Sequence, residues 1–181
     1  MFSTDTHTVE FTIKNKLGFH VRPTQRVAEM AQAFESDVQV QVGERDADGK
    51  SVLQLMGLHC TAGSQMQVTA SGPDAEQCTK VIEFLGHDRF FVEDHVDYLD
   101  PERHLKRLAG ISSCFESDIE VEVDGQRCDA KDLDAIRQLN IEPTTAVEFD
   151  VEGPDADQAR AVLQKLAKHK FYVEEKMGES S

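Results

Sequence analysis

Apolar and polar residues alternate in several short stretches of the chain, and each such stretch predicts a β-strand with one buried face. Three stretches near the start alternate in this way: residues 9–13, 38–42 and 66–70. A polar turn at residues 43–49 leaves room for a further short strand. Helical spacing or a helix-start signal predicts three helices: residues 22–34, 51–58 and 72–85. Elements in this order predict an α+β fold, an open-faced sandwich in which helices cover one side of a small sheet.

The same pattern returns 81 residues further along the chain. Two motifs show this offset: Phe-Glu-Ser-Asp at residues 34–37 and 115–118, and Gly-Pro-Asp-Ala at residues 72–75 and 153–156. Residues 22–94 align without a gap on residues 103–175, and 22 of the 73 aligned positions are identical. The repeat predicts two copies of one domain, residues 1–94 and 95–181. We expect the first strand of the second copy at residues 89–94, which also end the first copy.

The composition is typical of soluble globular domains, with 39% hydrophobic and 7% aromatic residues. No apolar run approaches the roughly 20 residues that a membrane span needs. Residues 1–5 lack the basic start and apolar core of a secretion signal. The net charge of −15 argues against nucleic acid and against an anionic membrane surface as partners.

The cysteines and histidines give no sign of a metal or redox site. The four cysteines are widely separated and form no Cys-x-x-Cys pair: Cys60, Cys78, Cys114 and Cys128. The seven histidines show no metal-ligand spacing. We therefore expect reduced thiols packed in or near the cores, a cytoplasmic location, and neither a metal nor a cofactor.

The candidate chemistry lies in residues 17–23, Leu-Gly-Phe-His-Val-Arg-Pro. Pro23 fits the first position of a helix because it lacks a backbone N–H and has a fixed φ. His20 would then sit just outside the helix start, where unpaired N–H groups and the helix dipole stabilise a negatively charged adduct on its ring. Arg22 adds a planar cationic group that suits phosphate oxygens. A histidine in this place is also typical of a solvated loop or a helix cap.

A second candidate is Ser51, directly before the predicted short helix that starts at Val52. A serine in this place is an ordinary N-cap residue, and that structural role is sufficient to explain it.

Two segments together resemble the HPr family, the histidine-containing phosphocarriers of the bacterial phosphotransferase system. Residues 18–23, Gly-Phe-His-Val-Arg-Pro, resemble the active-site signature, and residues 50–56, Lys-Ser-Val-Leu-Gln-Leu-Met, resemble the regulatory-serine signature. The resemblance implies two tandem HPr-like domains. In each, a four-stranded, mainly antiparallel sheet would be covered on one face by three helices.

The same resemblance implies a role for each site residue. His20 would accept a phosphoryl group from enzyme I and pass it to an IIA-type protein, so the chain would be a carrier and not an enzyme with its own turnover. Arg22 would stabilise the phosphoryl group, with Gly18 and Pro23 in supporting positions. Ser51 would be the regulatory site, and an HPr serine kinase would be a further partner.

The second copy lacks this chemistry, because Pro101 stands at the position of His20. His104 and His95 lie nearby, but neither has a Gly-x-His-x-Arg-Pro context. Asp132 replaces Ser51 and is expected to cap the corresponding short helix. We therefore interpret the second copy as degenerate and retained for interaction, regulation or stabilisation, and we expect its last residues, 174–181, to fray.

Three other functions remain open on the sequence. The chain could be a regulatory adaptor derived from HPr, in which His20 is only a contact residue. It could be a small-molecule-binding α+β regulatory domain, which predicts a pocket between the halves. An independent enzyme is disfavoured, because no paired carboxylates, nucleophile–base set or cofactor loop accompanies His20.

Overall fold

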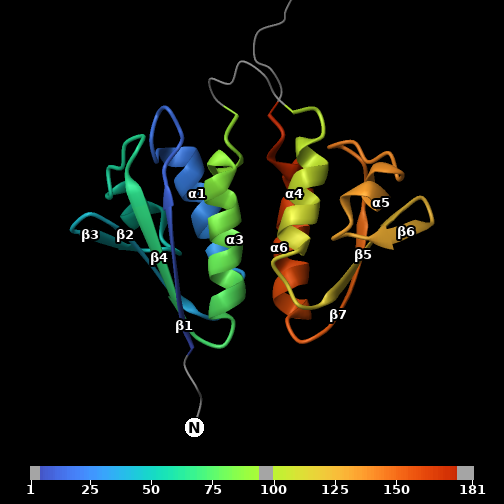
Figure 1. Ribbon diagram of the computed structural model, residues 1–181, viewed down its shortest axis with the longest axis horizontal. Helices are drawn as coiled ribbons and strands as arrows, with labels where there is room; N and C mark the ends of the chain where they lie inside the picture. The colour runs from blue at the N-terminus through green and yellow to red at the C-terminus, as the bar shows by residue number, and fades with distance from the viewer. Residues whose placement is uncertain (1–4, 94–99, 175–181) are drawn as a thin grey trace, which may run out of the picture.

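The computed structural model describes residues 5–93 and 100–174, and its first half is a four-stranded sheet with helices on one side (Figure 1). The elements follow in this order: β1 (Thr6–Thr12), α1 (Val21–Ala31), β2 (Asp37–Val42), β3 (Arg45–Asp48), α2 (Val52–Met56), β4 (Gln65–Ser71), α3 (Ala75–His87) and the 3-10 helix η1 (Arg89–Phe91). The strands pair in the order β1-β4-β2-β3, and every pairing is antiparallel. Val40 and Val68 lie opposite each other and are fully buried, as the alternating pattern predicts.

The second half repeats most of this architecture. Its elements are α4 (Arg103–Ser112), β5 (Asp118–Val123), β6 (Gln126–Asp129), α5 (Leu133–Arg137), β7 (Glu148–Glu152), α6 (Ala156–Lys168) and the 3-10 helix η2 (Lys170–Tyr172). Its strands pair antiparallel in the order β6-β5-β7. The α+β class and the tandem organisation are confirmed, but this sheet has three strands within the described residues.

The first strand expected for the second half, at residues 89–94, does not form in the part of that segment that the structure describes. Arg89–Phe91 form η1, and the chain continues without a strand to residue 93. Phe90 and Phe91 are both fully buried, whereas a half-buried strand would bury only one of two neighbours. Positive φ angles of 51°, 56° and 59° at residues 89–91 turn the chain so that both rings enter the core. The prediction of a four-stranded second sheet is therefore wrong for the described residues.

The helices of the two halves face each other, and the two sheets form the outer layers (Figure 1). Residues 81 positions apart meet across this interface: Phe34 stacks on Phe115 with ring centroids 6.2 Å apart and planes 7° apart. Phe91 also packs on Tyr172, with ring centroids 5.9 Å apart and planes tilted by 37°. The buried apolar residues of both halves form one continuous core. The duplicated domains therefore pack with approximate two-fold symmetry, as the subunits of a homodimer do.

One residue of the interface must be glycine. Gly110 on α4 lies beneath the ring of Phe84 on α3, and a Cβ at this position would come within 2.1 Å of that ring. The Phe84 ring occupies the space that a side chain at this position would need, so a larger residue would push the two helices apart.

A buried carboxylate links the halves. Glu93 has a side chain only 4% exposed and forms an ion pair with Arg107, whose Nη2 lies 3.0 Å from Oε1. It also accepts hydrogen bonds from Arg103 and from the backbone N–H of Glu174, the latter at 2.9 Å. The Arg107 guanidinium is 3% exposed and also lies over the ring of Phe91, 4.7 Å from its centroid. A buried charge must be paired to be tolerated, so these contacts act together to hold the interface.

The two repeated sequence motifs, residues 34–37 and 72–75 in the first half, are joined by hydrogen bonds. Asp74 accepts hydrogen bonds from the backbone N–H groups of Glu35 and Ser36 at 2.8 and 2.9 Å, and from the Ser36 hydroxyl. Burial opposes ionisation of Asp74, but these hydrogen bonds outweigh it, so its pKa lies below its usual value. Asp155 and Ser117 repeat this arrangement in the second half. Both motifs therefore serve the fold and not the chemistry.

Candidate functional site

His20 is the N-cap residue of α1, and a tight loop fixes its position. The Phe19 N–H donates to the Cys60 carbonyl at 3.1 Å, and the buried Phe19 ring packs on Phe90 at 5.2 Å. Gly18 has a φ of +72°, and a Cβ there would lie 2.3 Å from the Cys60 carbonyl oxygen. The glycine is therefore required both by the left-handed backbone and by the close approach.

The helix begins two residues earlier than the position of Pro23 suggests. α1 starts at Val21, and its first backbone hydrogen bond to the loop runs from Thr24 N–H to the His20 carbonyl at 3.1 Å. Pro23 is thus the third helical residue, which still needs no N–H because the first turn of a helix has no acceptors for one. The N–H groups of Val21 and Arg22 have no acceptor within the helix for the same reason. With no acidic residue in this turn, the helix start favours an anion beside His20.

Arg22 is paired with a carboxylate of the second half. Its Nη1 lies 2.9 Å from Oε1 of Glu174, and Nη2 of Arg26 lies 3.1 Å from the same oxygen. Glu174 falls inside the segment that was expected to fray, so this expectation is wrong for that residue; residues 175–181 lie outside the described residues. Arg22 is 43% exposed and can move, whereas Arg26 is 11% exposed and lies over the Tyr172 ring at 4.8 Å.

The electrostatics of Arg26 follow from its burial. Burial lowers the pKa of the guanidinium, and the hydrogen bond and charge of Glu174 oppose that shift. Arg26 also donates to the Phe90 carbonyl at 3.2 Å. Arg26 is therefore the buried cation near His20, and Arg22 is the exposed one.

Ser51 is the N-cap of α2, as predicted. Its hydroxyl oxygen accepts from the Gln54 N–H at 3.3 Å. The short helix that it caps packs against α1, so Ser51 lies on the same side of the domain as His20. Ser51 is only half-buried, so the residue is partly accessible at the surface.

No local pattern in the sequence indicates an exposed apolar patch beside the histidine. Among the described residues, four large apolar side chains are exposed, and all lie in the first half: Leu17, Val21, Leu53 and Met56. Leu17 and Val21 flank His20 in the chain, and Leu53, 82% exposed, projects from α2. Comparing the copies could have found the patch, because the counterparts of Val21, Leu53 and Met56 are charged: Glu102, Asp134 and Arg137.

In the second half these charged residues neutralise one another. Arg137 forms a two-pronged contact with Glu102, at 3.0 Å for each pair of atoms, and reaches Asp134 at 2.6 Å. His104 is buried, and its Nε2 lies 2.7 Å from the Ile141 carbonyl, a structural role. His95 lies outside the described residues. Asp132 accepts from the Ala135 N–H at 3.2 Å, which confirms the predicted N-cap.

Other nucleophiles are poorly suited to reaction. Burial raises the pKa of Cys78 and of Cys114 to about 12, so both thiols stay protonated at neutral pH. No group of metal-ligating side chains occurs within residues 5–93 and 100–174. No helix in the same part of the chain is long and apolar enough to cross a membrane.

Comparison with known proteins decides the family. The model described as "PTS HPr component phosphorylation site" matches residues 7–86 and again residues 102–169. The chain belongs to the HPr family. The two matches coincide with the two halves of the structure, so the tandem HPr-like organisation inferred from the repeat is confirmed.

Individual relatives agree with the family. The chain is 36% identical over 84 residues to the phosphocarrier protein NPr of Escherichia coli K12, and the match covers 46% of this chain and 91% of NPr. A multiphosphoryl transfer protein of Xanthomonas campestris is 41% identical over 71 residues, 39% of this chain, but the match spans only 8% of that protein. A solved HPr structure from Thermoanaerobacter tengcongensis is 30% identical, with a TM-score of 0.46, and covers 48% of this chain and 98% of its own. The relatives named HPr and NPr are phosphocarrier proteins, and the matches cover 89% and 91% of their lengths.

Proposed function

We propose that the chain carries a phosphoryl group on His20, accepted from phosphorylated enzyme I and passed to a histidine on an IIA-type protein. One observation carries the proposal: the corresponding helices of the two copies differ at their N-caps, which are His20 for α1 and Glu102 for α4. His104 lies inside the first turn of α4 and is buried. The helix start attracts an anion, and Arg22 stands two residues away.

The proposed chemistry is a transfer of one phosphoryl group between nitrogen atoms. A neutral imidazole nitrogen of His20 attacks the phosphorus atom, a phosphorus–nitrogen bond forms, and the bond to the donor breaks. The N–H groups of Val21 and Arg22 and the Arg22 guanidinium stabilise the added charge. The group must remain transferable, so a site with one mobile cation suits a carrier better than a closed, fully charged pocket.

The exposed apolar patch of Leu17, Val21, Leu53 and Met56 is the proposed docking face for both partners. A soluble domain seldom exposes several large apolar side chains together without an interaction to cover them. The second half has ion pairs in place of this patch, so we propose that partners dock on the first half alone.

A two-step transfer assay tests the proposal. The chain is incubated with enzyme I and radiolabelled phosphoenolpyruvate, and an IIA-type protein is then added. We expect the label to enter the chain and then to leave it for the IIA-type protein. If the wild-type chain takes no label, it is not a carrier, and the adaptor function becomes the better explanation.

The domain division and location are part of the same proposal. The family model matches residues 7–86 and 102–169, so a domain boundary between residues 86 and 102 is consistent with both matches. This supports domains of residues 1–94 and 95–181. All four cysteines are free, which supports a cytoplasmic location.

Glu174 is expected to restrain phosphorylation through Arg22. The phosphoryl group and Glu174 compete for one guanidinium, so Glu174→Gln should raise the initial rate of phosphorylation by enzyme I. A partly exposed ion pair is worth under about 1 kcal/mol, which corresponds to a two- to fivefold increase at most. The control is Glu76→Gln, which removes one charge from the exposed pair with Lys80. Equal initial rates of phosphorylation for the two variants would show that the contact between Glu174 and Arg22 does not restrain phosphorylation.

Ser51 is the proposed regulatory site, because a phosphate there adds about two negative charges beside Leu53 and Met56. Ser51→Asp adds one charge and keeps the cap, as Asp132 shows in the second half. Ser51→Asn is the matched control, because it keeps a capping group without a charge. We expect enzyme I to bind Ser51→Asp several-fold more weakly than Ser51→Asn in calorimetry. Identical affinities of enzyme I for the two variants would show that a negative charge at position 51 does not regulate binding.

A further inference from the structure

The second sheet has an open edge where the first sheet has β1. In the first half β4 is paired on both sides, with β1 and with β2. Its counterpart β7 pairs only with β5 within the described residues. The Ile119 carbonyl accepts from the Ala130 N–H, on the side of β5 that faces away from β7. Ile119 and Val151 are opposite each other, so they form a pair without mutual backbone hydrogen bonds. The backbone N–H and C=O of Val151 therefore point away from β5, toward the open edge. No strand pairs with this edge within the described residues, although the Val151 carbonyl accepts from Nη2 of Arg160 at 3.1 Å. An edge without a neighbouring strand is a template for another strand.

A shallow hollow with a mixed lining lies beside this edge. It has a volume of about 470 Å3 and lies between β7 and the end of α6, lined by the apolar side chains of Val147, Phe149 and Ala167 and by the polar side chains of Glu148, Gln164 and Lys168. In the first half the same place is filled by Phe11 of β1, which pairs with Met66 and packs so closely on Gly86 that a Cβ there would lie 2.3 Å from its ring. Val147 and Ala167 stand 81 positions after Met66 and Gly86. The hollow can therefore take an apolar or aromatic side chain, which must lie farther from α6 than Phe11 lies from α3 because Ala167 carries a Cβ where Gly86 has none.

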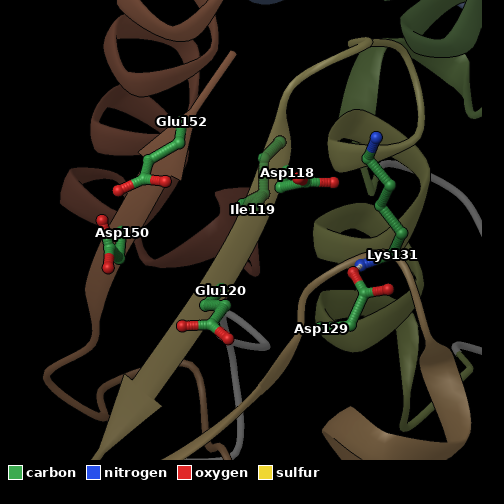
Figure 2. Close-up of a pocket in the computed structure, with 7 residues that line it drawn as sticks. All are labelled: Asp118, Ile119, Glu120, Asp129, Lys131, Asp150 and Glu152. Atoms are coloured by element: carbon green, nitrogen blue, oxygen red, sulfur yellow. Dashed lines mark hydrogen bonds between the residues drawn. The ribbon is translucent and has the colours of Figure 1, made fainter.

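The face next to this edge is strongly acidic. Carboxylates lie directly opposite each other on β5 and β7 in three pairs: Asp118 and Glu152, Glu120 and Asp150, and Glu122 and Glu148. Figure 2 shows Glu120 on β5 and Asp150 and Glu152 on β7 lying on this face. Like charges in opposite positions destabilise a sheet, and Arg127 is the cation paired with them in the described residues. The first half has Gln, Thr or Ser at five of the six positions: Gln39, Gln41, Gln67, Thr69 and Ser71.

We propose that β7 binds an extended segment of another protein, which adds to the sheet as an antiparallel strand in the place of β1. The segment has basic residues at alternate positions, which face the acidic side of the sheet, and an aromatic residue between them, which fills the hollow beside Ala167. A second copy of this chain does not fit, because pairing of β7 with itself would set Glu148, Asp150 and Glu152 against the same acids.

The test uses a peptide with the sequence of residues 6–13 of this chain, with lysine at the four outward-facing positions 6, 8, 10 and 12. We expect the full chain to bind this peptide with a Kd of about 10–100 μM in fluorescence anisotropy. A peptide with glutamate at those positions should bind at least about tenfold more weakly. The amide protons of Phe149 and Val151 should exchange more slowly once the lysine peptide is bound.

Two variants separate strand addition from simple charge attraction. Ala167→Phe fills the hollow without changing a charge, and it should weaken binding of the lysine peptide at least about tenfold. Glu148→Lys combined with Glu152→Lys should reverse the preference between the two peptides.

Several results would overturn the proposal. One is equal binding of a scrambled lysine peptide, which would indicate charge attraction alone. Another is slow exchange at Phe149 and Val151 before any peptide is added, in a monomer or in a dimer, because the edge would then already be covered by this chain. A third is the binding of neither peptide, which would mean that the acids only keep the edge strand from aggregating.

Discussion

Replacing His20 with alanine is expected to abolish phosphorylation of the chain by enzyme I and phosphoenolpyruvate, down to the background of the assay. The variant lacks the imidazole at the N-cap of α1 to which the proposal assigns the phosphoryl group. The helix α1 should still form, because the His20 side chain makes no capping hydrogen bond to it. Label incorporation and far-ultraviolet circular dichroism are measured on the same preparation.

The matched control is His87→Ala, which removes an exposed histidine from the same half. His87 lies at the end of α3, 3.4 Å from Glu83, and has no part in the proposed site. We expect it to be labelled at the wild-type rate. Normal labelling of His20→Ala would show that another residue accepts the phosphoryl group.

The largest effect on stability is expected for Arg107→Ala. The Arg107 side chain is 3% exposed and contacts Glu93 at 3.0 Å, Asp88 at 3.2 Å and the Phe171 carbonyl at 2.9 Å. Its removal leaves the buried Glu93 carboxylate with Arg103 as the remaining ion-pair partner and leaves the Phe171 carbonyl without this donor. Breaking a buried pair in this way costs about 3–5 kcal/mol. Urea unfolding, followed by circular dichroism, should show a loss of this size.

Arg127→Ala provides the comparison, because Arg127 also has several carboxylate partners. It lies on the exposed face of the second sheet, 53% exposed, beside Glu120, Glu122 and Asp150. Water screens these contacts, so we expect a cost below about 1 kcal/mol. If Arg107→Ala costs no more than Arg127→Ala, the buried charges do not hold the two halves together.

The sequence predicted the elements whose cause is local. The N-caps at Ser51 and Asp132 follow from side-chain chemistry one residue before a short helix, and both are confirmed. The position of His20 outside a helix start is also confirmed. The predicted range, residues 22–34, begins one residue after the observed start at Val21. Pro23 is the third helical residue and not the first, because a proline is tolerated anywhere in the first turn.

The sequence failed where contacts between the halves decide the structure. The apolar run at residues 90–92 was interpreted as a strand, but Phe91 is buried against Tyr172 of the other half, which no local pattern contains. Glu174 was placed in a fraying tail for the same reason, since its partners Arg22 and Arg26 are about 150 residues away in the chain. The family comparison confirms the tandem fold, while the roles of His20 and Arg22 rest on the geometry and on the proposal.

The measurement that tests the account most directly is the location of the phosphoryl group on the wild-type chain. The chain is phosphorylated by enzyme I and phosphoenolpyruvate, and the intact chain and its fragments are examined by mass spectrometry under conditions that preserve phosphohistidine. The account predicts one phosphoryl group per chain, on His20 in the first half. A phosphoryl group on His104 or on another residue of the second half, or none at all, would contradict it.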